Sequence, residues 1–144
     1  MTMFNSFEVI ASGLSAARQR MNVIASNVAN AETTRTPDGG PYKRRDVVQV
    51  ANSIQSKFSN ALDRMSLFKP SVQAVIEDNE DPRLVHQPGH PDANEEGYVA
   101  YPNINVVTSM TDMMSTARLY QANVTALEQV RKMEQEASRI SIRF

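Results

Sequence analysis

Apolar and small residues near the N-terminus recur with the spacing of one helical face. From Phe7 to Ala31 the gaps alternate between three and four residues, and no proline occurs before Pro37. This alternation is typical of a coiled-coil seam. We therefore predict a long N-terminal helix, with Gly13 as a weak point that costs about 1 kcal/mol relative to alanine. Its seam consists of Phe7, Ile10, Leu14, Ala17, Met21, Ile24, Val28 and Ala31.

The C-terminal part of the chain repeats this spacing. Pro102 excludes a helix upstream, and Asn103 or Asn105 can cap a helix that starts after it. The predicted seam is Val106, Met110, Met113, Ala117, Tyr120, Val124 and Leu127. After a slip of the kind called a stammer, the pattern continues through Val130, Met133, Ala137, Ile140 and Phe144.

The middle of the chain has a different character. All 7 prolines and all glycines except Gly13 lie between residues 32 and 103, which indicates turns. Residues 53–67 fit either a helix or a loop. Short β-rich runs predict a small antiparallel β unit with strands at 42–50, 71–77, 83–86 and 97–101.

These elements predict a mainly α fold with a small β insertion. The two long terminal helices pair like a coiled coil, parallel or antiparallel, and flank a short antiparallel β unit. Residues 1–35 form an N-terminal assembly helix and residues 36–102 the β-rich insertion. Residues 103–144 form a C-terminal assembly helix, in one structural unit with the first.

Composition excludes several classes of protein. The chain has 144 residues, of which 6% are aromatic. It contains no cysteine, so we expect no disulfide scaffold, thiol nucleophile or cysteine-based zinc site. No apolar run is long enough for a transmembrane helix, and the first residues lack the basic region of a secretory signal. The net charge of −1 gives no general attraction to nucleic acid, although residues 77–96 carry acidic side chains against Arg83 alone.

Few residues suggest catalysis. His86, His90 and Asp92 lie close in sequence, but Pro88 and Pro91 prevent the helix that would align the histidines. We interpret them as polar loop residues and assign no catalytic, cofactor-binding or metal-binding residue. The methionines of the second helix fit ordinary packing, or else a contact surface that adapts to several neighbours.

Two stretches at opposite ends of the chain carry a family resemblance. Residues 11–33 end in Asn27-Val28-Ala29-Asn30-Ala31-Glu32-Thr33, and residues 115–123 contain Arg118-Leu119-Tyr120-Gln121-Ala122-Asn123. They resemble the N-terminal N-[LIV]-A-N-x-x-T and C-terminal R-x-Y-x-A-N signatures of bacterial flagellar basal-body rod and hook proteins. The short chain and the tracts 36–44 and 88–99 are most similar to the proximal rod members.

The resemblance implies a structural subunit without enzymatic activity. Such subunits pack their terminal helices into an axial helical tube that transmits motor torque and encloses the export channel. The implied partners are other copies of the chain, other proximal and distal rod subunits and the export-gate adaptor, with no nucleic acid and no membrane span. The implied location is the flagellar basal body, across the periplasm, after type III export without a cleaved signal peptide.

The resemblance also leads to an expected assembly interface. Its packing positions are Leu14, Met21, Ile24, Val28, Met113, Ala117, Tyr120, Val124 and Leu127. Polar cross-links between helices are expected from Asn27, Asn30, Arg118 and Asn123, although the asparagines could instead cap helices or face solvent. Two alternatives remain: another axial rod or adaptor subunit, or a periplasmic metal-dependent enzyme in which His86, His90 and Asp92 converge.

Overall fold

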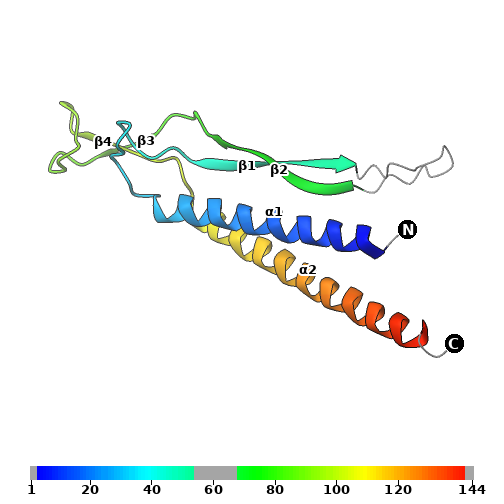
Figure 1. The fold of residues 1–144 in the computed structure, drawn as a ribbon. Helices are drawn as coiled ribbons and strands as arrows, with labels where there is room; N and C mark the ends of the chain where they lie inside the picture. The colour runs from blue at the N-terminus through cyan, green and yellow to red at the C-terminus, as the bar shows by residue number, and fades with distance from the viewer. Residues whose placement is uncertain (1–2, 54–67, 142–144) are drawn as a thin grey trace.

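Along the chain, a long helix comes first, four strands follow it, and a second long helix comes last. The computed structural model describes residues 3–53 and 68–141 (Figure 1). Residues 54–67, which we expected to be helix or loop, and Phe144 of the second seam lie outside the described residues. The elements are α1 (Met3–Ala29), β1 (Arg45–Ser53), β2 (Phe68–Glu77), β3 (Arg83–His86), β4 (Tyr98–Tyr101) and α2 (Val106–Ser141).

Both predicted helices are confirmed, with 27 residues in α1 and 36 in α2. The predicted cap of α2 is Asn105, whose Oδ1 accepts a hydrogen bond from the Thr108 backbone N–H at 3.1 Å. The helices run antiparallel. They lie together where α1 ends and α2 begins, and they diverge toward the two chain termini (Figure 1).

The predicted fold class is wrong, because the β part is neither small nor a single unit. β1 pairs with β2 and β3 pairs with β4, each pair antiparallel, as two separate two-stranded sheets. The irregular segment 78–82 separates β2 from β3, and each strand pairs within its own hairpin. The chain therefore has an α+β fold with two helices and two β-ribbons.

The β1–β2 ribbon lies along α1 for much of the helix length (Figure 1). Its register shifts between Val48 and Gln49, where Val48 pairs with Ala74 and Gln49 with Val72. An isolated two-stranded ribbon is marginally stable, so packing against a helix is a physical requirement. α1 is thus the middle layer, in contact with the ribbon and with α2.

The buried apolar core of the described residues is small. It consists of Ala16 and Ala17 in α1, Ala31 in the turn after α1, and Val99 in β4. Alanine lets backbones approach closely but removes little apolar area from water. Most packing in this chain therefore leaves larger side chains partly exposed.

Candidate assembly surface

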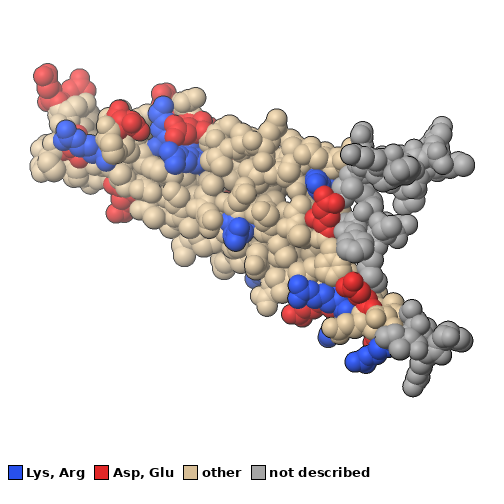
Figure 2. Space-filling model, in the orientation of Figure 1, with Lys and Arg blue, Asp and Glu red and all other residues tan. Residues whose placement is uncertain are grey.

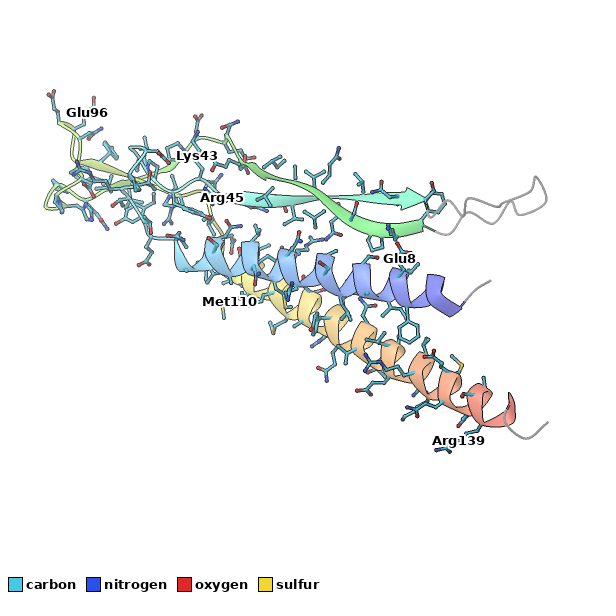
Figure 3. All side chains as sticks on the ribbon, in the orientation of Figure 1. Glu8, Lys43, Arg45, Glu96, Met110 and Arg139 are labelled. Atoms are coloured by element: carbon cyan, nitrogen blue, oxygen red, sulfur yellow. The ribbon has the colours of Figure 1, made fainter. Side chains whose placement is uncertain are left out.

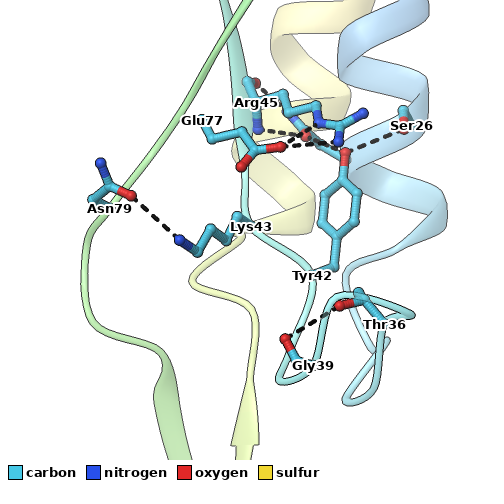
Figure 4. Close-up of polar contacts among 9 residues, drawn as sticks. Ser26, Thr36, Gly39, Tyr42, Lys43, Arg45, Glu77 and Asn79 are labelled. Atoms are coloured by element: carbon cyan, nitrogen blue, oxygen red, sulfur yellow. Dashed lines mark hydrogen bonds and ion pairs between the residues drawn. The ribbon is translucent and has the colours of Figure 1, made fainter.

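The end of α1 is joined to the start of β1 through a buried amide. Asn27 is 5% exposed, and its Nδ2 donates to the Arg45 carbonyl at 2.7 Å. Its Oδ1 accepts from the Arg45 backbone N–H at 2.9 Å and from the Tyr42 hydroxyl at 3.2 Å (Figure 4). The amide thus satisfies both backbone groups of one residue, as a neighbouring strand would.

Asn30 and Thr33 complete the turn that follows α1. Asn30 Nδ2 donates to the Ser26 carbonyl at 2.9 Å, and Thr33 Oγ1 donates to Asn30 Oδ1 at 3.2 Å. The Tyr42 backbone N–H donates to the Thr33 carbonyl at 3.0 Å. The polar residues of the N-terminal signature therefore bond within their own segment and to the chain leading into β1, whereas we expected cross-links between helices. Their role in assembly remains a prediction.

Small residues bring α1 and α2 together. A Cβ added to Gly13 would lie 3.3 Å from Asn123 Nδ2, so the glycine admits the amide from the facing helix. Ala16, Ala17 and Thr116 are buried nearby on the two helices. The weak point predicted at Gly13 is therefore also the point of close approach.

The covered face of α2 is displaced by about one position from the predicted seam at several points. Val106 and Met110 are exposed, as is Ala117, while Thr116 is only 6% exposed. Most of the covered positions follow the same alternation of three and four: Ser109, Met113, Thr116, Tyr120, Asn123, Leu127 and Val130. Val124 and Ala126 are partly buried as well. The covered face therefore overlaps the predicted seam at Met113, Tyr120 and Leu127 and departs from it at Val106, Met110 and Ala117.

The other expected interface residues divide by exposure. Ala117 and Arg118 are exposed on α2. Partly buried within the subunit are Leu14, Met21, Ile24 and Val28 of α1, and Met113, Tyr120, Asn123, Val124 and Leu127 of α2.

One exposed apolar strip on α2 is called here the outer face and consists of Val107, Met110, Met114 and Ala117. Val107 is 74% exposed and Met114 57%. Figure 3 shows Met110 directed away from α1, and Figure 2 shows few charges over the middle of the helices on the visible side. The spacing of these methionines also fits a core, so the sequence alone does not show that their side chains stay uncovered.

A groove of about 400 Å³ lies beside α1, between α2 and the ribbon. Its α1 side includes Gly13, Ala17 and Arg20, and its α2 side includes Asp112 and Leu119. Leu119 is 57% exposed, so apolar surface remains open to solvent there. Arg20 was not among the expected interface residues, because it is charged and does not belong to the apolar seam predicted for the first helix.

The C-terminal part of α2 extends beyond the part of the helix that packs on α1 (Figure 1). Every residue from 131 to 139 is exposed, including Met133 at 55%. Figure 2 shows basic and acidic side chains mixed on this part. A long, fully exposed helix gains little from tertiary packing, which normally supplies most helical stability.

The histidine loop has a structural arrangement. His90 Nδ1 accepts the Asp92 backbone N–H at 3.1 Å, and the Asp92 carboxylate accepts the Thr34 hydroxyl at 2.8 Å. The His86 ring packs against Tyr98. Within residues 3–53 and 68–141, no group of three or more His, Asp or Glu side chains could hold a metal ion. The metal-dependent alternative therefore lacks a constellation among the described residues.

None of the described helices combines the length and apolarity needed to cross a bilayer.

The acidic residues of the segment 77–96 make polar contacts around the β-ribbons. Glu77 pairs with Arg45 at 2.9 Å, and Glu80 accepts from Asn103 at 2.8 Å (Figure 4 shows the first). Glu96 lies at the tip of the hairpin end (Figure 3).

Comparisons with known proteins identify relatives over nearly the whole chain. Residues 7–35 match the family model "Flagella basal body rod protein", and residues 95–140 match "Flagellar basal body rod FlgEFG protein C-terminal". The flagellar basal-body rod protein FlgC of Escherichia coli O6:H1 is 40% identical, over 92% of this chain and 93% of its own length. The FlgC of Bacillus subtilis is 40% identical over 97% and 99%, and that of Borreliella burgdorferi 35% over 95% and 96%.

Proposed function

This chain belongs to the FlgC family of flagellar basal-body rod proteins, and on that premise we propose how its surfaces serve the rod. The family resemblance predicted from the sequence is confirmed. The protein is a structural subunit of the flagellar basal body and assembles with other rod subunits. Membership in a structural family also argues against an enzymatic role.

We propose that the outer face of α2 and the exposed residues 131–139 of the same helix pack against neighbouring subunits in an axial helical tube. The observation that carries this proposal is the small core beside many exposed apolar side chains. Among the residues that the structure describes, three of the four buried apolar core residues are alanines, whereas Val107, Met110 and Met114 are each more than half exposed. Contiguous exposed apolar surface of this kind is typical of protein–protein contacts.

The finer roles follow from the same proposal. The tube lies in the proximal rod, surrounds the export channel and transmits torque through contacts spread over long helices. Its neighbours are other copies, the other proximal and distal rod subunits and the export-gate adaptor. The subunit reaches its place across the periplasm by the flagellar type III route. Contacts that do not close on themselves build open helical assemblies, as a rod requires.

The interface residues of the proposal include both covered and exposed positions. Ala117 and Arg118 are exposed on α2 and available to a neighbour. The partly buried positions, such as Leu14 and Tyr120, hold α1 and α2 together within the subunit. The part of each side chain that stays exposed contributes to the contact with a neighbouring subunit.

A charge on the outer face tests the proposal. Met110→Glu and Met114→Glu place a carboxylate on a surface that the rod would cover, so we expect loss of rod assembly and swimming while the subunit remains folded. The matched control is Thr108→Glu, which carries the same charge on the first turn of α2 after the Asn105 cap, where glutamate is favourable. Wild-type incorporation of both methionine variants into basal bodies would contradict the proposal.

A further inference from the structure

Methionine supplies all the sulfur of this chain. The sequence contains 8 methionines and no cysteine, so no thiol within the chain competes with the thioethers for an oxidant. Among the methionines whose side chains the structure describes, Met110, Met114 and Met133 are each more than half exposed. Met21 and Met113 are partly buried. An oxidant in solution therefore reaches the first three more readily than the other two.

Two of the exposed methionines form a pair on the outer face of α2. Residues four apart stand one turn above each other on the same side of a helix, so Met110 and Met114 are neighbours. Figure 3 shows Met110 directed away from α1. Val107 and Ala117, the other members of the outer face, are exposed as well. Met113 lies between the pair in sequence but belongs to the covered face, which makes it an internal reference for the effect of burial.

Oxidation changes the chemical character of this face. When hydrogen peroxide meets a thioether, the sulfur lone pair attacks one peroxide oxygen and the O–O bond breaks. The second oxygen takes the proton of the first and leaves as water, so the sulfur loses two electrons and the peroxide gains them. The product is a sulfoxide, a polar group in place of an apolar side chain. Because burial of a polar group without a hydrogen-bond partner is unfavourable, a neighbour that covers the oxidised face binds it more weakly.

We propose that Met110 and Met114 form an oxidation site at which a peroxide blocks assembly of the free subunit. The inference rests on the proposed function, because the block requires that neighbours cover the outer face. It adds a chemical state of that face, since the pair is open to the oxidant before assembly and covered afterwards. Methionine sulfoxide reductases return the apolar side chains, so the block is reversible.

Peptide mass spectrometry of the purified subunit tests the reactivity of the site. During a time course with hydrogen peroxide, we expect sulfoxide to form several times faster at Met110 and Met114 than at Met113. Met133, which is 55% exposed, should react at a rate similar to that of the pair. Circular dichroism should show unchanged helix content after oxidation of the pair. Equal rates at Met113 and the pair, or a loss of helix content when only the pair is oxidised, would overturn the proposal.

The effect on assembly is measured in cells without methionine sulfoxide reductases. A sublethal pulse of hydrogen peroxide is applied during rod formation, and only isotope-labelled subunits made immediately before the pulse are counted. The sulfoxide fraction at Met110 and Met114 should be several-fold lower in isolated basal bodies than in the free subunit of the same cells. Equal fractions would overturn the proposal, because oxidised subunits would then assemble as readily as reduced ones.

Leucine variants supply the matched controls. Leucine has nearly the volume of methionine and no sulfur, so Met110→Leu combined with Met114→Leu keeps the outer face apolar and removes the site. Rod formation in this double variant should be less sensitive to the pulse than in the original chain, whereas Met113→Leu should leave the sensitivity unchanged. Equal sensitivity in the double variant and the original chain would overturn the proposal.

The comparison of free and assembled subunits needs no substitution, so it decides the proposal even where the double variant itself disturbs assembly. Failure of the proposed function has a different signature, because Met110→Glu and Met114→Glu would then enter basal bodies normally without any peroxide.

Discussion

Replacing Asn27 with alanine should loosen the junction between α1 and β1. The amide of Asn27 makes the only side-chain bonds to the Arg45 backbone among the described residues, one as donor and one as acceptor. Alanine keeps the helix, since its helix propensity exceeds that of asparagine. The substitution therefore removes the bonds and leaves the local secondary structure in place.

The expected cost follows from the groups left without partners. A buried donor or acceptor that loses its partner costs about 1–3 kcal/mol. Two backbone groups of Arg45 and the Tyr42 hydroxyl lose a bond to Asn27, but Arg45 is exposed enough for water to replace part of the loss. We therefore expect the free energy of unfolding to fall by about 2–3 kcal/mol.

Urea unfolding of the purified subunit, followed by circular dichroism, measures this change. A typical denaturant slope converts it into a midpoint lower by about 1 M. Hydrogen exchange adds a local readout, because the Arg45 amide should exchange about 30-fold faster in Asn27→Ala than in the original chain. The control is Asn22→Ala, an exposed asparagine on the same helix, for which we expect a change within about 0.5 kcal/mol. Equal midpoints and equal Arg45 exchange in the two variants would refute the role assigned to the amide.

Two further substitutions test local geometry and a surface charge pair. Gly97 has φ +80°, and an added Cβ would lie 3.1 Å from Pro88 Cβ, so Gly97→Ala should lower thermal stability by about 2 kcal/mol. Gly89→Ala, where an added Cβ meets nothing within 4 Å, should change it little; equal melting temperatures would contradict this assignment. The Lys69–Glu8 pair joins the ribbon to α1 with side chains 35% and 48% exposed. A double-mutant cycle with Glu8→Gln and Lys69→Gln should give about 0–1 kcal/mol, decreasing in high salt; a larger, salt-independent coupling would be evidence against a surface pair.

The helices could be predicted from the sequence because their signal is local and repeated. Alternation of three and four residues over many turns has few interpretations other than a helix, and Pro102 with Asn105 marks the start of α2. The strands were located to within a few residues. β3 agrees with its predicted bounds, and β1 begins at Arg45, three residues after the predicted start.

The partition of the strands and the covered face of α2 could not be predicted in the same way. Pairing depends on which distant segments meet, and β propensity alone does not distinguish one four-stranded unit from two ribbons. The face of α2 that meets α1 depends on where the backbones can approach. That place is set by Gly13 and Ala16, whose lack of bulk is weak as a sequence signal but decisive in packing.

The two helices therefore differ in what a substitution does. α1 is covered by α2 on one side and by the ribbon on another, and its signature amide Asn27 is bonded inside the subunit. Substitutions on its covered positions act first on the stability of the folded subunit. α2 packs against α1 only, among the described elements, and its outer face and residues 131–139 remain open. Substitutions there leave the subunit nearly as stable as before, so any loss of rod formation must arise from contacts with neighbours. Stability of the purified subunit, measured alongside assembly in cells, separates the two effects for each residue.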